Sequence, residues 1–98
     1  MAIDDKTRDL VWSKGIVVPN FNQDLYRKDQ CNAWMTYSEY GNRDSDYGWE
    51  IDHIKPTSNG GLDALSNLRP LHWKNNAAKS KGNLVCVVKA DGTKNQGV

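Results

Sequence analysis

The chain has 98 residues and a formal net charge of +1, which suffices for one domain with a thin core. No apolar run approaches the roughly 20 residues that cross a bilayer. The polar start from Met1 to Lys6 lacks the basic and apolar regions of a signal peptide. These features exclude a membrane partner and predict a single domain over residues 1–98 with a cytoplasmic location. In that reducing compartment we expect Cys31 and Cys86 to be buried free thiols, with a disulfide as the less favoured alternative.

Charge is distributed unevenly along the chain. Residues 1–53 carry six Lys/Arg against ten Asp/Glu, a balance of −4, whereas residues 54–98 carry seven against two, a balance of +5. This asymmetry suits a polyanion lying against the C-terminal half, although charge alone slightly favours an ordinary solvated face.

The first half of the chain gives few secondary-structure signals. Residues 1–9 are polar, and we expect them to be frayed. The apolar run 15–18 stops at Pro19 and predicts a short strand or an extended arm. Residues 21–48 mix aromatic and charged side chains without a consistent period, so only the turn or loop at 41–46 is assigned there.

The pattern becomes clearer from residue 49 onward. Residues 49–54 alternate and predict a strand, which Pro56 ends because proline cannot donate to a ladder. Trp49, Ile51 and His53 are expected on one side of this strand, opposite Glu50, Asp52 and Ile54.

The later elements are predicted from equally local signals. A loop runs to Asn67, and a second extended segment covers 68–72. A helix is expected over 73–81, ended by the next glycine. Residues 84–88 predict a strand that turns at 91–92.

The adjacent pair Asp52-His53 predicts hydrolytic chemistry at a metal. Phosphodiester hydrolysis needs a base to deprotonate water and positive charge on the developing phosphorane and leaving oxygen. His53 is the natural base, because an unperturbed imidazole is mostly neutral at pH 7. Asp52 offers a hard anionic oxygen and Asn76 a neutral amide oxygen. Two protein oxygens suit Mg²⁺ or Mn²⁺, which keep several waters, whereas catalytic zinc usually takes three protein ligands.

Each of these residues also has an ordinary explanation. An isolated Asp-His pair is more often at a surface than at a site, and Asn67 alone would be a turn residue or a cap. Trp49 and Trp73 are expected to be core anchors rather than base-stacking platforms. The spacing of the residues favours a site. That site requires the strand to end or twist sharply near His53, because neighbours on a regular strand point to opposite faces.

The segment from Trp49 to Pro56, together with several later residues, resembles the signature of the HNH endonuclease family. The later matching residues are Gly60-Gly61, Asn67-Leu68, Leu71 and Asn76-Ala77-Ala78-Lys79. The resemblance covers about residues 49–80, which would form the core motif. It implies an α+β fold, a small ββα-metal (His-Me finger) domain in which a hairpin and a helix clasp one divalent ion. An N-terminal arm or strands and a C-terminal strand would extend this core.

The resemblance also implies roles for individual residues. His53 would be the general base, and Asn67 would pin the loop that orients it; both are assigned as catalytic. Asp52 and Asn76 would hold the metal. Asn76 stands where the last histidine of the family name usually lies, which makes this an H-N-N variant and favours Mg²⁺ or Mn²⁺ over Zn²⁺ or Ni²⁺. Lys79 could contact substrate phosphate.

A wider set of residues is expected to contact nucleic acid. These are Lys55, Arg69, His72, Lys74, Lys79 and Lys81. His72 has two equally weighted interpretations, because it shares a helical face with Asn76 but could equally be a structural histidine.

The chain lacks the two Cys-x-x-Cys pairs that hold a structural zinc in many members of the family. His72 and Asn75 stand where the second pair would lie. We therefore expect no structural zinc, and aromatic packing from residues 26–49 together with the strand at 84–88 would have to replace it. A zinc site formed by Cys31, Cys86 and His72 is the less favoured alternative.

The expected function is that of a nicking or nonspecific divalent-metal-dependent DNA endonuclease. The alternative is a non-catalytic nucleic-acid-binding or packaging accessory module on the same fold, and a nuclease directed at RNA is a third option. Because so small a basic half contacts few phosphates, a homodimer or a larger phage or mobile-element machinery would serve as partner.

Overall fold

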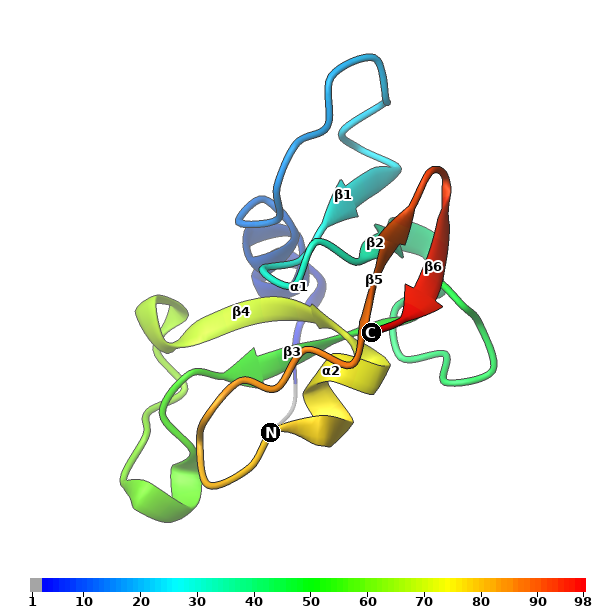
Figure 1. Cartoon of the computed structure of the whole chain (residues 1–98). Coiled ribbons are helices and arrows are strands. Elements are labelled where there is room, and N and C mark those ends of the chain that lie inside the picture. The colour runs from blue at the N-terminus through cyan, green and yellow to red at the C-terminus, as the bar shows by residue number, and fades with distance from the viewer. Residues whose placement is uncertain (1–2) are drawn as a thin grey trace.

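A computed structural model describes residues 3–98, which fold into two α-helices, three short 3₁₀ helices and three antiparallel hairpins (Figure 1). The α-helices are α1 (Asp5–Trp12) and α2 (Trp73–Ala78), and the strands are β1 (Tyr26–Lys28), β2 (Trp34–Thr36), β3 (Trp49–His53), β4 (Leu68–His72), β5 (Val88–Asp91) and β6 (Lys94–Gly97). The strands pair as β1–β2, β3–β4 and β5–β6, so the predicted α+β class is confirmed. No helix within residues 3–98 has the length and hydropathy of a membrane span.

Helix α1 corrects the expectation of frayed residues 1–9 from Asp5 onward, while residues 1–2 lie outside the part of the chain that the structure describes. The Asp4 side chain accepts a 2.7 Å hydrogen bond from the backbone N–H of Thr7, which caps the first turn. At the other end Val11 and Trp12 are buried. The helix was missed because only these two side chains mark its apolar face, too few to give a helical period in a polar segment.

The core is an aromatic cluster centred on Trp49. This side chain is fully buried and packs with Val11, Trp12, Met35 and Leu68. The Trp49 and Trp12 rings lie 5.0 Å apart between centroids. The prediction that Trp49 anchors the core is confirmed.

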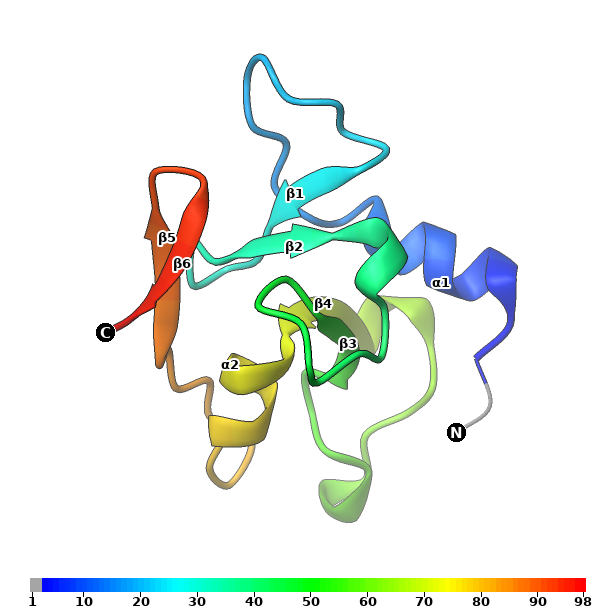
Figure 2. The same ribbon diagram turned by 90° about the vertical axis from the view of Figure 1, so that its right-hand side faces the viewer.

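Hairpin β3–β4 and helix α2 form the unit that carries the site. Trp49 pairs with His72 and His53 with Leu68, so the hairpin is in register over its full length. Helices α1 and α2 lie on opposite sides of it (Figure 2). Both strands and the start of α2 fall where predicted, but α2 ends at Ala78, because Lys79 takes an extended conformation.

The expected strand at 84–88 is wrong in its position. Residues 84–87 are not in a strand, and β5 begins only at Val88. The backbone N–H groups of Val87 and Val88 bond instead to the side-chain oxygen of Asn75, at 2.8 and 3.0 Å. A side chain therefore replaces the ladder partner that a strand would need. The turn lies at Gly92-Thr93, one residue later than predicted, because Asp91 still pairs with Lys94, and it leads into β6.

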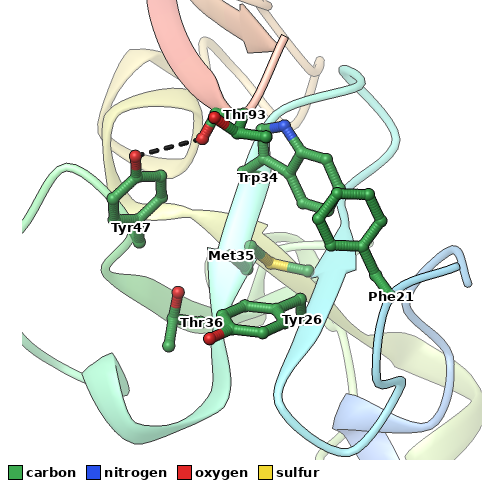
Figure 3. A pocket seen from close by; sticks show the side chains of 7 residues that line it. All are labelled: Phe21, Tyr26, Trp34, Met35, Thr36, Tyr47 and Thr93. Carbon is green, nitrogen blue, oxygen red and sulfur yellow. Dashed lines mark hydrogen bonds between the residues drawn. The ribbon is translucent and has the colours of Figure 1, made fainter. Parts of the chain in front are cut away.

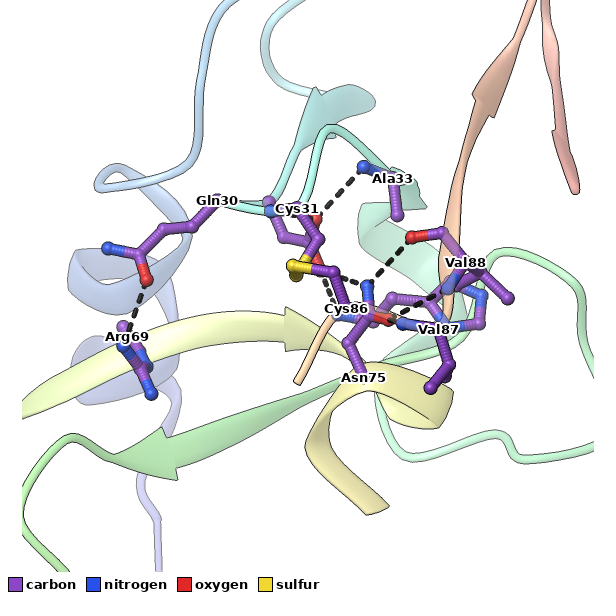
Figure 4. Close-up of a disulfide and its surroundings, with 10 residues drawn as sticks. Gln30, Cys31, Ala33, Arg69, Asn75, Cys86, Val87 and Val88 are labelled. Atoms are coloured by element: carbon purple, nitrogen blue, oxygen red, sulfur yellow. Dashed lines mark hydrogen bonds between the residues drawn. A yellow bond between two sulfur atoms is a disulfide. The ribbon is translucent and has the colours of Figure 1, made fainter. Parts of the chain in front are cut away.

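A disulfide joins Cys31 to Cys86, so the free-thiol prediction is wrong (Figure 4). The two Cα atoms lie 5.4 Å apart. The link fastens the turn between β1 and β2 to the segment that comes after α2. Sequence could not reveal this proximity, because 55 residues separate the two cysteines.

Hairpin β5–β6 docks on β2 through Trp34 and Asn95. The Trp34 indole donates to the Gly92 carbonyl at 2.7 Å, and Asn95 bonds both the N–H and the C=O of Trp34. An apolar hollow of about 330 Å³ opens beside this junction (Figure 3). Its lining residues are Phe21, Tyr26, Trp34, Met35, Thr36, Tyr47 and Thr93.

Candidate active site

Asp52, His53, Asn76 and Lys79 line one open hollow of about 270 Å³ between the end of β3 and helix α2. A larger depression of about 670 Å³ adjoins it, sharing Asp52, Asn76 and Lys79. Since β3 ends at His53, the side chains of Asp52 and His53 border the same hollow although they are neighbours in sequence. The strand thus ends where it must if the adjacent side chains of Asp52 and His53 are to reach one site.

Asp52 lies at the centre of a charged cluster. Its side chain is 6 % exposed; Oδ2 accepts from Arg69 Nε at 2.8 Å and Oδ1 from Lys79 Nζ at 2.7 Å. Arg69 is the cross-strand neighbour of Asp52, so register alone brings this pair together. Lys79 Nζ also donates to the His53 carbonyl at 2.6 Å. The Asp52 carboxylate and the His53 carbonyl oxygen therefore already hold the Lys79 ammonium group at this point of the site.

The expected nucleic-acid contacts fall into two groups. The side chains of Arg69 and Lys79 are only 12 % exposed and lie against Asp52. Lys55, Lys74 and Lys81 are exposed. Of these, Lys81 lines the larger depression, while the Lys74 ammonium lies 5.3 Å from the centre of the Trp73 ring.

The Asn76 amide is oriented by a residue that sequence reasoning did not select. Asn76 Nδ2 donates to Glu50 Oε1 at 2.9 Å. Arg43 in turn makes two 2.7 Å hydrogen bonds to the Glu50 carboxylate. These bonds, chiefly that from Arg43, hold the pKa of Glu50 below its usual value. The available signal was the spacing of Glu50 and Asp52, which places both on the strand face turned toward α2.

His53 is paired with Asp63, a second residue that the sequence did not single out. The distance between Nε2 and Asp63 Oδ1 is 2.8 Å, and the His53 side chain is 20 % exposed. Because a carboxylate accepts hydrogen bonds, this contact assigns the proton to Nε2 and leaves Nδ1 as the basic nitrogen. Asp63 is the one acid among the basic residues between Ile54 and Ala90, which was the available clue.

Asn67 holds the loop between β3 and β4 together. Its side chain accepts from the Lys55 N–H at 2.8 Å and donates to the carbonyls of Lys55 and Leu62 at 3.0 and 2.8 Å. Gly60 adopts φ +85°, and a Cβ on Gly61 would lie 1.8 Å from the Lys55 carbonyl oxygen. These contacts close the loop that carries Asp63, so Asn67 is placed to act on His53 through the backbone.

His72 is a structural residue, which corrects its assignment to the nucleic-acid contacts. It is 1 % exposed, and Nδ1 accepts the Lys74 N–H at 3.0 Å as the cap of α2. The other ring nitrogen bonds the Asp46 carbonyl at 2.8 Å. Burial lowers the pKa of His72 below its usual value. Since both nitrogens are occupied inside the protein, the ring offers nothing to a phosphate.

The donor set beside the hollow fits a hard divalent cation. Among residues 3–98, no group of three or more His, Cys, Asp or Glu side chains is placed to hold a metal. The candidate ligands that line the hollow are the carboxylate oxygens of Asp52 and the amide oxygen of Asn76. Mg²⁺ and Mn²⁺ prefer oxygen ligands of this kind. Each carboxylate oxygen of Asp52 has two lone pairs, so its bonds to Arg69 and Lys79 leave coordination capacity.

Residues 40–82 match the HNH endonuclease family. The matched segment contains β3, the loop, β4 and α2, and therefore every residue of the smaller hollow. Comparisons with curated proteins and with solved structures found no match. A domain of this family indicates nuclease activity or nucleic-acid binding, generally with a divalent metal. This match, with a β-hairpin and a helix at the site, identifies residues 40–82 as an HNH endonuclease domain.

Proposed function

We propose that the protein is an endonuclease that hydrolyses DNA phosphodiester bonds with one divalent ion, Mg²⁺ or Mn²⁺. The observation that carries this proposal is the convergence of Asp52, His53 and Asn76 on one hollow within the matched segment. A base and two oxygen ligands on one open hollow are the components that hydrolysis of a phosphate ester needs.

His53 would act as the general base. Nδ1 would take the proton from the attacking water, because the bond to Asp63 occupies Nε2. The Asp63 carboxylate would stabilise the imidazolium that forms and keep the ring in place. Asn67 would support both by closing the loop between them.

Asp52 and Asn76 would hold the ion. When bound, it would stabilise negative charge on the phosphorane and on the departing 3′ oxygen, which leaves 5′-phosphate and 3′-hydroxyl ends. Arg69 and Lys79 bring two positive charges to the single negative charge of Asp52, so this cluster keeps a net charge of +1. That excess favours a bound phosphate, and Lys79 is the cation that also lines the hollow.

One observation favours the second candidate, a non-catalytic nucleic-acid-binding module. Both oxygens of Asp52 already bond to cationic side chains, which would compete with a metal ion for this ligand. If that competition prevails, the exposed lysines would bind the nucleic acid backbone without cleavage. Such binding would weaken steeply with salt.

The test is cleavage of supercoiled plasmid in Mg²⁺ and in Mn²⁺, with EDTA as the blank. The His53→Ala variant is expected to lose a factor of about 10² to 10⁴ in rate, the usual contribution of a general base. Asn83→Ala, at an exposed asparagine outside the hollow, is the control and should cleave as the wild type does. Equal cleavage by wild type and His53→Ala would refute the nuclease assignment.

The same preparations separate the remaining alternatives. Salt-sensitive binding without product in either ion would select the binding module. Single-stranded RNA offered beside duplex DNA would reveal a nuclease directed at RNA. The mass of the protein on DNA, measured by light scattering, would reveal a homodimer, whose second basic surface would add phosphate contacts.

A further inference from the structure

We propose that Glu50, held by Arg43, is a positioning residue that turns the carbonyl oxygen of Asn76, rather than its amino group, toward the hollow beside Asp52. This inference rests on the proposed function in one respect: Asn76 must use that oxygen to bind a cation.

The geometry places Glu50 directly behind the ligand. Glu50 and Asp52 lie two residues apart on β3 and both contact side chains at or just beyond α2. The bond from Asn76 Nδ2 to Glu50 Oε1 measures 2.9 Å. Asn76 borders both hollows that Asp52 lines. The Asn76 amide is therefore hydrogen-bonded to Glu50 on one side and borders the open hollow on the other.

The chemistry of the amide explains why its orientation needs the hydrogen bond to Glu50. The two ends of an asparagine side chain have nearly the same shape, but one donates and the other accepts. A rotation of about half a turn would present Asn76 Nδ2 to the ion and repel it. A carboxylate only accepts hydrogen bonds, so the contact with Glu50 is satisfied in one of the two orientations.

Arg43 makes this acceptor rigid. Its Nε and one terminal nitrogen each lie 2.7 Å from a Glu50 oxygen, a two-point contact that leaves the carboxylate little freedom to rotate. The contact also neutralises the charge of Glu50, which would otherwise compete with Asp52 for the cation. Arg43 belongs to the loop at 41–46, so that loop acquires a function at the site.

The decisive experiment measures Mn²⁺ affinity by electron paramagnetic resonance in the absence of DNA. Glu50→Gln is expected to weaken Mn²⁺ binding about 10- to 100-fold, the usual cost of losing a residue that orients a metal ligand. In an Asn76→Asp background the same substitution should instead strengthen binding, since a glutamine can donate to the new carboxylate whereas Glu50 repels it. A sign reversal of this kind requires that Glu50 act through residue 76.

Glu39→Gln is the matched control. Glu39 accepts a 2.9 Å bond from Asn42 Nδ2, the same pair of groups at the same distance but outside the hollow. It should leave Mn²⁺ affinity unchanged. A second readout needs no metal: the side-chain amide resonances of Asn76 in a ¹H–¹⁵N spectrum should shift in Glu50→Gln and stay in place in Glu39→Gln. Thermal unfolding of each variant verifies that it is folded.

The outcomes separate this inference from the proposed function. Unchanged Mn²⁺ affinity in Glu50→Gln, with a wild type that binds, would overturn the inference alone. Equal weakening in the Asn76 and Asn76→Asp backgrounds would make Glu50 a direct ligand and would also overturn it. A wild type that binds no Mn²⁺ would overturn the proposed function and the inference together.

Discussion

Helix α2 has two sides that differ in burial and in chemistry. On the inner side, Asn75 is fully buried and bonds to Asp29 and to the backbone of Val87 and Val88. On the outer side, the adjacent residue Asn76 borders the open hollow and reaches Glu50. Two neighbouring asparagines therefore serve opposite purposes on a helix of six residues.

The inner side fastens α2 to the β1–β2 turn and to the segment before β5. Asp29 accepts hydrogen bonds from the N–H groups of Cys31, Ala33 and His72 and from the Asn75 amide, and it is 1 % exposed. The Cys31–Cys86 disulfide closes the same region covalently. We expected aromatic packing from residues 26–49 together with a strand at 84–88 to hold this region in place of a structural zinc. The structure adds a buried carboxylate, an amide and a disulfide, and these fix α2 so that its outer side can stay open.

Removal of the disulfide should give the largest effect on stability. The Cys31→Ser/Cys86→Ser variant, or reduction of the wild type, is expected to cost about 4 kcal/mol of unfolding free energy, because the bond closes a loop of 55 residues. This corresponds to a fall of roughly 15–30 °C in Tm for a domain of this size. Thermal unfolding with and without dithiothreitol measures it. An unchanged Tm on reduction would show that the hydrogen bonds of Asp29 alone hold α2.

Substitution of the two asparagines tests the comparison directly. Asn75→Ala would leave the buried N–H groups of Val87 and Val88 without partners and is expected to cost about 3 kcal/mol. Asn76→Ala should cost less than about 1 kcal/mol, because its contact with Glu50 is partly open to water, but it should weaken Mn²⁺ binding. Urea unfolding and metal titration of both variants give the result. Similar losses of stability in Asn75→Ala and Asn76→Ala would contradict the proposed difference between the inner and outer sides of α2.

The unit at the site was the part of the fold that the sequence predicted best. Residues 49–53 alternate and 68–72 form a compact extended run, so local pattern determines β3 and β4. Residues 84–88 carry an equally strong strand pattern. The disulfide at Cys86 and the hydrogen bonds to the Asn75 side chain nevertheless hold this segment in place without a partner strand before Val88. Long-range contacts override local propensity there, and no local pattern encodes them.

The candidate site consists only in part of residues that were selected from the sequence. Asp52, His53 and Asn76 were selected from type and spacing, and the structure brings them to one hollow. Glu50 and Asp63 were missed, because their importance depends on which side chains the fold places opposite them. His72 was ambiguous for the same reason, since only burial separates a capping histidine from a ligand.

Lys79 gives a smaller effect, divided between stability and function. Lys79→Met keeps the length of the side chain but removes the bonds to Asp52 and to the His53 carbonyl, at a cost of about 2 kcal/mol. Cleavage should also fall, because the charged cluster loses its positive excess. Lys89→Met, at an exposed lysine on β5, is the control and should change neither. Plasmid cleavage and urea unfolding measure the two parts, and full activity in Lys79→Met would remove this lysine from the phosphate contacts.

The pH dependence of stability tests His72 and should give the smallest change. Burial lowers the pKa of His72 in the folded state, so the unfolded chain binds its proton first as pH falls. Folding is therefore favoured above the ordinary histidine pKa near 6.5, and this contribution is lost as pH falls through the lower folded-state pKa. His72→Asn keeps an acceptor for the Lys74 N–H but cannot titrate. Its stability should fall less between pH 7 and 5 than that of the wild type, with a difference in slope below about 1.4 kcal/mol per pH unit, the limit for one proton. Urea unfolding of both proteins measures the unfolding free energy across this range. An equal pH dependence in the two would mean that His72 is protonated as easily in the folded as in the unfolded state. The inner side of α2 would then be less closed to water than its contacts indicate.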